Sequence, residues 1–133
     1  MEKLNKTLVI MGGILYLIFG VFHLTFFRVF NQSNPDFNQI VPFLSKIMVM
    51  LNVGVIVFFV SMGVIILRFR SDIIHTKFGK SILLMSALFF IIRGSAEFAF
   101  PTFKTAFVIT MFVVSFVYLI PALSKHKKSI ERL

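Results

Sequence analysis

Cysteine and tryptophan are both absent from this chain of 133 residues, and charged residues make up only 14% of it. Without cysteine, the chain has no disulfide framework, no thiolate metal site, no CxxC redox pair and no cysteine nucleophile. Soluble domains carry about 25% charged residues, so the low charge excludes an ordinary water-soluble globule. The sequence therefore predicts a protein whose surface faces mostly lipid.

Apolar residues make up 58% of the chain, and they gather in four long runs at 8–30, 43–67, 81–100 and 105–123. Each run has about 19 to 25 residues, which as a helix crosses about 30 Å of hydrocarbon. Unsatisfied backbone groups are costly in lipid, and β-type alternation is missing. We therefore predict an all-α fold, an integral membrane four-helix bundle that forms a single transmembrane domain over residues 1–133.

Turn-forming residues separate the four runs. Residues 31–36 are NQSNPD, and Pro42 stands near the first position of the second helix. Gly79 is expected to separate a charged loop from the third helix, and Pro101 to mark a tight turn before the fourth.

Basic residues indicate how the helices cross the membrane. They gather before the first run, in a basic loop at 68–80 and in a tail at 124–133. Because positively charged segments stay inside, we predict an up-down-up-down bundle in the cell membrane with both termini cytoplasmic. The net charge of +9 is then a topology signal and does not indicate nucleic-acid binding. With no tryptophan present, Tyr118 is expected in the aromatic belt at the inner interface.

Polar residues within the first run share one helix face. Gly13, Tyr16, Gly20, His23 and Phe27 recur at a spacing of three and four residues. The small residues on this face favour close approach of another helix. We expect the face to point into the bundle, where His23 either donates a hydrogen bond to a neighbouring helix or contributes to a site.

The third run contains charged residues at membrane depth. Ser86, Arg93 and Glu97 lie on one face, and the last two are spaced to form an ion pair. Counted back from Pro101, Arg93 lies about 12 Å below the outer boundary. An arginine at mid-helix costs roughly 2.5 to 3.5 kcal/mol, so an unpaired position facing lipid is disfavoured.

The second run adds Lys46 near its outer end and Asn52 near its middle, one heptad from Ser45. Interhelical hydrogen bonding is the usual role of such an asparagine. Lys104 stands near the outer end of the fourth run, and both lysines are equally compatible with snorkelling to lipid head groups. Depth predicts that the polar residues converge in the outer half of the bundle. The candidate ligand-binding residues are His23, Arg93, Glu97, Lys46, Tyr16 and Asn52.

Three functional hypotheses follow from this cluster. In the first, the protein binds or transports a small amphiphile, anionic or lipid-like: Arg93 engages an anion, Glu97 orients Arg93 and His23 supplies a hydrogen-bonding group. In the second, it is a structural or accessory subunit of a membrane complex, and the ion pair only fixes helix packing. In the third, it is a small membrane enzyme with His23 and Glu97 as acid and base.

Partners and cofactors are less constrained by the sequence. The lipid bilayer is the surrounding partner, and the glycine-lined faces favour a homo-oligomer or a partner membrane protein. No second histidine accompanies His23 at membrane depth, so no metal site is predicted, and no cofactor is assigned.

Overall fold

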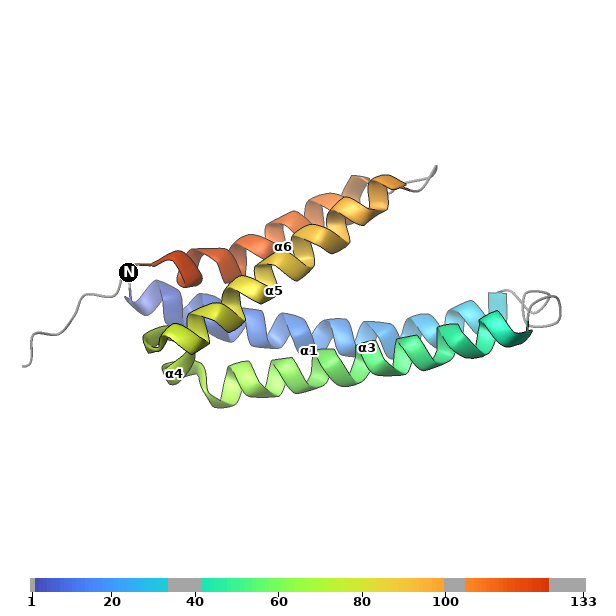
Figure 1. Ribbon diagram of the computed structural model, residues 1–133, viewed down its shortest axis with the longest axis horizontal. Helices are drawn as coiled ribbons and strands as arrows, with labels where there is room; N and C mark the ends of the chain where they lie inside the picture. Colours follow the sequence, from blue (N-terminus) through green and yellow to red (C-terminus); the bar gives the residue numbers. More distant parts are fainter. Residues whose placement is uncertain (1, 34–41, 100–104, 125–133) are drawn as a thin grey trace, which may run out of the picture. The chain divides into compact units, whose positions relative to one another are not determined.

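The computed structural model describes residues 2–33, 42–99 and 105–124, with the side chains of 26–33 and 42–45 left aside. The elements, in chain order, are α1 (Glu2–Ser33), α3 (Pro42–Arg68), α4 (Arg70–His75), α5 (Lys77–Ala96), the 3-10 turn η1 (Glu97–Ala99) and α6 (Thr105–Leu123) (Figure 1). The described part of the chain contains no strand, which confirms the all-α prediction. Pro42 is the first residue of α3, as predicted.

Within the described residues, four helical segments are long and apolar enough to cross a membrane. They extend over Glu2–Thr25, Lys46–Arg68, Lys77–Ala99 and Thr105–Leu123. Each contains one of the four predicted runs in whole or in large part, so the described residues have the four apolar helices that a small membrane protein requires.

The predicted basic loop at 68–80 is largely helical, so its interpretation as a loop was wrong. Residues 70–75 form α4, and α5 already begins at Lys77. Ile73 and Ile74 explain why this charged segment is helical. Both side chains are buried, and an apolar pair among basic residues favours an amphipathic turn of helix. The hydroxyl of Thr76 accepts a hydrogen bond of 2.9 Å from the Gly79 amide and so caps α5.

Gly79 does not separate a loop from a helix, contrary to the prediction, but lies buried in the first turn of α5. A Cβ atom at this position would stand 2.2 Å from Ile73 Cα and 2.4 Å from its carbonyl oxygen. Since both are backbone atoms, only glycine allows α4 and α5 to approach this closely.

The structure groups the chain into two compact units, each of which is described by itself. One comprises Met1–Gly12 and Phe69–Leu133, and the other comprises Gly13–Arg68. We name the first the α5–α6 unit and the second the α1–α3 unit, after the paired helices in each (Figure 1). The single transmembrane domain stays a prediction.

In the α1–α3 unit, the predicted glycine face of α1 packs on α3. A Cβ at Gly63 would lie 3.0 Å from the Gly13 carbonyl oxygen, and one at Gly20 would lie 3.1 Å from Val60 Cγ2. Tyr16 is fully buried, with its ring centroid 5.6 Å from that of Phe59. These contacts run in opposite order along the two helices, so α1 and α3 are antiparallel, and the expected close approach is confirmed.

In the α5–α6 unit, Tyr118 lies at the centre of the packing. Its ring stacks on Phe90 with centroids 5.5 Å apart and planes at 6°. Its hydroxyl donates a 2.7 Å hydrogen bond to the Gly12 carbonyl oxygen. Because Tyr118 is fully buried, it does not belong to an aromatic belt facing lipid head groups, contrary to expectation.

Candidate functional site

His23 and Asn52 join α1 to α3 through two short contacts. The imidazole Nδ1 of His23 lies 2.8 Å from the amide oxygen Oδ1 of Asn52. The amide Nδ2 of Asn52 donates a 3.1 Å hydrogen bond to the backbone carbonyl oxygen of His23. The interhelical hydrogen bonding expected of Asn52 is therefore present, and its partner is the histidine of the predicted glycine face.

Aromatic rings surround this pair. The His23 ring centroid lies 5.4 Å from that of Phe59, with the planes tilted by 33°. Phe22 meets His23 edge-on at 6.1 Å, and Phe19 stacks on Phe59 at 5.8 Å. Phe59 is 3% exposed and Phe22 is 55% exposed, so the imidazole contacts one buried ring and one ring at the surface of the unit.

Arg93 and Glu97 form the predicted ion pair at the end of α5. The guanidinium Nη1 lies 3.3 Å from the Glu97 carboxylate oxygen Oε2. The Arg93 side chain is 47% exposed, whereas that of Glu97 is only 17% exposed. Glu97 follows the last residue of α5, where the helix dipole disfavours a negative charge, so Arg93 offsets an otherwise unfavourable carboxylate.

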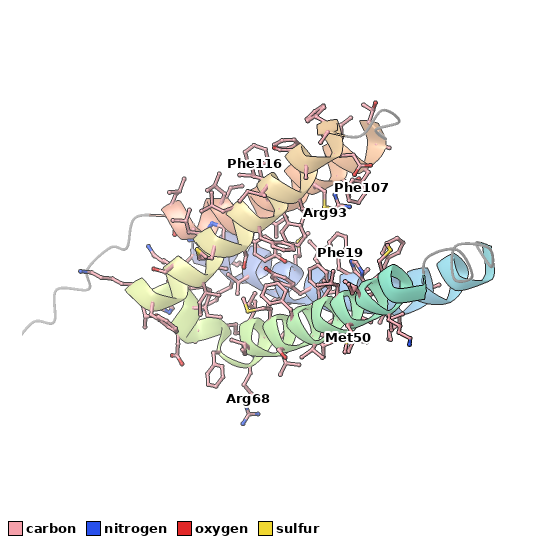
Figure 2. All side chains as sticks on the ribbon, turned by 45° about the vertical axis from the view of Figure 1, so that its right-hand side comes forward. Phe19, Met50, Arg68, Arg93, Phe107 and Phe116 are labelled. Carbon is pink, nitrogen blue, oxygen red and sulfur yellow. The ribbon has the colours of Figure 1, made fainter. Side chains whose placement is uncertain are left out.

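A third side chain holds the guanidinium in place. The Cζ atom of Arg93 lies 4.7 Å from the ring centroid of Phe107 in α6. Figure 2 shows the two labelled side chains close to each other, one from each helix of the unit. A cation over an aromatic face contributes about 0.5 to 2 kcal/mol, and the contact orients the plane of the guanidinium. The Arg93 guanidinium thus contacts Glu97 through one nitrogen and Phe107 through its face.

The remaining predicted residues have different surroundings. Tyr16 is fully buried and packs against Phe58 and Phe59, with ring centroids 6.1 and 5.6 Å away. Lys46 is exposed at the first residue of its candidate span. Ser86 is buried, and its hydroxyl donates to the carbonyl oxygen of Ile82, one turn earlier in the same helix. Lys104, Phe27 and Ser45 lie outside the described side chains.

The six candidate residues are divided between the two units. Tyr16, His23, Lys46 and Asn52 belong to the α1–α3 unit, and Arg93 and Glu97 belong to the α5–α6 unit. Their convergence at one level of a membrane stays a prediction. No group of three or more histidine, aspartate and glutamate side chains that would hold a metal ion occurs among the described residues.

Sequence reasoning missed Phe59 and Phe107 as aromatic neighbours of the polar pairs. For Phe107, a partial signal exists in the sequence: the tight turn predicted at Pro101, which lies outside the described residues, would pair Arg93 with a residue about as far after the turn as Arg93 stands before it. This comparison of distances along the chain narrows the candidates to about one helical turn of α6. It does not select the side chain, because the rotation of each helix about its own axis decides which residue faces α5.

Comparisons with protein-family models, with curated proteins and with solved structures found no match for this chain.

Proposed function

We propose that this chain is a multi-pass protein of the cell membrane that binds a small amphiphile through an anionic group held by Arg93. Its helices would cross the bilayer up-down-up-down, with both termini and the α4 segment in the cytoplasm. The basic residues before α1, around α4 and after α6 support that orientation. Arg93 then stands in the outer half of the third span.

The observation that carries this proposal is the state of the Arg93 side chain, which is oriented and still exposed. A guanidinium has five N–H donors in a planar fork that matches the oxygens of a carboxylate or a phosphate. Glu97 contacts it through Nη1 alone, at 3.3 Å, and Phe107 lies against its face. The side chain nevertheless remains 47% exposed. A group that is already oriented loses less conformational entropy when it binds an anion.

Exposed apolar side chains close to Arg93 in the sequence support a ligand with a hydrocarbon tail. Ile92 is 67% exposed and Phe98 is 60% exposed, one on each side of Arg93 along the chain. An anion with an acyl or prenyl chain would satisfy the guanidinium and these apolar surfaces together. An ionisable residue inside a candidate span is costly, and such residues usually mark ligand or ion sites.

A structural role is the second candidate, because one contact specifically favours it. Arg93 in α5 reaches Phe107 in α6, so the same side chain that would bind a ligand also links two helices. In this reading, the chain is an accessory subunit of a membrane complex, and the ion pair with Glu97 fixes the packing of the unit.

Thermal unfolding of the purified protein in neutral detergent tests the proposal. Phosphatidylglycerol and a long-chain fatty acid are the anionic probes, and phosphatidylcholine is the zwitterionic control. We expect the anionic probes alone to raise the Tm, since a ligand at 100 times its Kd stabilises by about 2.7 kcal/mol.

Two variants make this test specific to Arg93. Arg93→Gln should lose the ligand-induced rise in Tm, whereas Arg68→Gln should keep it. Arg68 is a matched control because it is an exposed arginine at the end of a helix in the other unit (Figure 2). An equal rise in the wild type and in Arg93→Gln would overturn the anion site, as would no rise in the wild type.

A further inference from the structure

The chain between the second and third candidate spans exposes aromatic rings. The spans Lys46–Arg68 and Lys77–Ala99 follow each other, so residues 69–76 lie at one face of the membrane whichever way the chain crosses it. Phe69 in this segment is 51% exposed, and Phe78, in the first turn of α5, is 76% exposed. A ring that faces lipid within a span needs no explanation, but Phe69 lies outside the candidate spans. Such a position is typical of the boundary between lipid head groups and acyl chains.

An exposed basic residue is adjacent in the sequence to each ring. Arg70 follows the first ring, and Lys77 precedes the second. Asp72 is the acidic residue between them, and Arg68 and Lys80 flank the segment, so its charge is positive. Basic residues interleaved with exposed aromatic rings are the pattern by which amphipathic segments lie on an anionic membrane surface.

Packing holds the two rings and the two basic residues at one end of the α5–α6 unit. Ile73 and Ile74 of α4 are buried, and the close approach at Gly79 brings α4 against the first turn of α5 (Figure 1). The hydroxyl of Thr76 caps α5 between the two. This end of the unit is therefore formed by packing within the protein and does not require lipid to assemble it. We name its four exposed side chains the α4 surface: Phe69, Arg70, Lys77 and Phe78.

We propose that the α4 surface docks on a lipid leaflet rich in anionic head groups. The basic side chains contact lipid phosphates, and the rings enter the acyl chains just beneath them. The partner is a leaflet and not a free phosphate, because the rings need an apolar phase. The four side chains are exposed, so each contact is weak, and the contacts add up only over the many lipids of a bilayer. This surface does not depend on the anion site at Arg93.

Tryptophan fluorescence tests the contact, because the chain has no tryptophan of its own. Phe69→Trp is placed in vesicles of phosphatidylglycerol and phosphatidylcholine, where bromine on the acyl chains of one lipid or the other quenches the fluorescence. One lysine or arginine near an anionic surface strengthens the attraction about fivefold. At equal content, we therefore expect brominated phosphatidylglycerol to quench about five times as strongly as brominated phosphatidylcholine.

Removal of the attraction should remove this preference. In the Phe69→Trp background, the further change Arg70→Gln/Lys77→Gln should make the two brominated lipids quench equally. A rise in salt from about 0.1 M to about 1 M should do the same, because it shortens the screening length from about 10 Å to about 3 Å. The salt comparison needs no further variant, so it tests the proposal even if the double replacement does not fold.

Phe116→Trp is the matched control. Phe116 is 55% exposed in α6 of the same unit, within a candidate span that has no charged residue (Figure 2). Both brominated lipids should quench this variant equally. Equal quenching of Phe69→Trp by the two lipids would overturn the docking, and so would no quenching of it while Phe116→Trp is quenched. Arg93→Gln should leave the preference at Phe69→Trp unchanged, which separates the α4 surface from the anion site. Absence of quenching in both tryptophan variants would overturn the membrane placement that the two proposals share.

Discussion

The two units hold their polar pairs in different ways. In the α1–α3 unit, an imidazole and an amide meet across the helix interface, with Asn52 bound to both the ring and the backbone of His23. In the α5–α6 unit, the charged pair lies four residues apart on one chain segment, and among the described residues its contact with the next helix is the stacking of Arg93 on Phe107. Both members of the His23–Asn52 pair therefore hold one helix against another, whereas Glu97 contacts Arg93 within one segment and Arg93 alone of this pair reaches the next helix among the described residues.

The close contacts at glycine differ in a similar way. A Cβ at Gly63 in α3 would lie 2.8 Å from the Leu17 side chain and 3.0 Å from the backbone oxygen of Gly13. A Cβ at Gly79 in α5 would have three backbone atoms of Ile73 as its nearest neighbours, the closest at 2.2 Å. A side chain can rotate away from an added methyl group, but a helix backbone cannot. Gly79 therefore tolerates an added methyl group less well than Gly63 does.

The largest effect is expected from Gly79→Ala, which should destabilise the protein by about 3 kcal/mol or more, the upper range for overpacking. Gly63→Ala should cost less, about 1 to 2 kcal/mol, because the Leu17 side chain can move. Denaturant unfolding in detergent measures both. Gly54→Ala is the control: a Cβ there meets nothing within 4 Å, so the change should be neutral or stabilising by up to about 1 kcal/mol. A cost at Gly54 equal to that at Gly79 would contradict the contact argument.

Replacement of one member of the ion pair should be next in size. Glu97→Leu leaves the Arg93 charge in a candidate span without its carboxylate partner and should destabilise by about 1 to 3 kcal/mol, less than the full cost of a lone arginine because the contact with the Phe107 ring remains. The double variant Arg93→Leu/Glu97→Leu should return close to wild-type stability. The same unfolding assay measures both.

Ligand binding by the double variant separates the two proposed functions. If Arg93 is an anion site, the double variant is stable and does not respond to phosphatidylglycerol. A stable double variant that supports full cellular function would favour the accessory subunit. A double variant as unstable as Glu97→Leu would contradict the view that Arg93 and Glu97 mainly compensate each other's charge.

A smaller loss is expected from Asn52→Leu. Interhelical hydrogen bonds in membranes contribute about 0.6 kcal/mol on average and up to about 1.7 kcal/mol, and this change removes two contacts to His23. Unfolding of Asn52→Leu, of His23→Leu and of the double variant gives the coupling energy between the two residues. A coupling energy of zero would mean that the pair does not hold α1 against α3.

The predicted orientation can be tested with single introduced cysteines, because the chain has no cysteine of its own. Ser71→Cys in α4 should react with a membrane-impermeant maleimide only after the cells are permeabilised. Ser33→Cys, at the end of α1, should react in intact cells. The opposite labelling pattern would contradict the assignment of α4 and both termini to the cytoplasm.

The sequence by itself determined the features that depend on residues close together in the chain. The four apolar segments follow from composition and run length, the start of α3 follows from Pro42, and the pairing of Arg93 with Glu97 follows from a spacing of four residues. The glycine face of α1 also follows from periodicity, since residues three and four apart share one side of a helix.

Only the tertiary structure decided which faces meet. That His23 binds Asn52, that Phe107 lies under Arg93 and that Tyr118 is buried all depend on the rotation and offset of one helix against another. Local spacing does not encode these two quantities, because they result from the summed packing of side chains distant in the sequence. The short helix α4 is a similar case, since burial of Ile73 and Ile74 outweighs the loop character of a segment rich in charge.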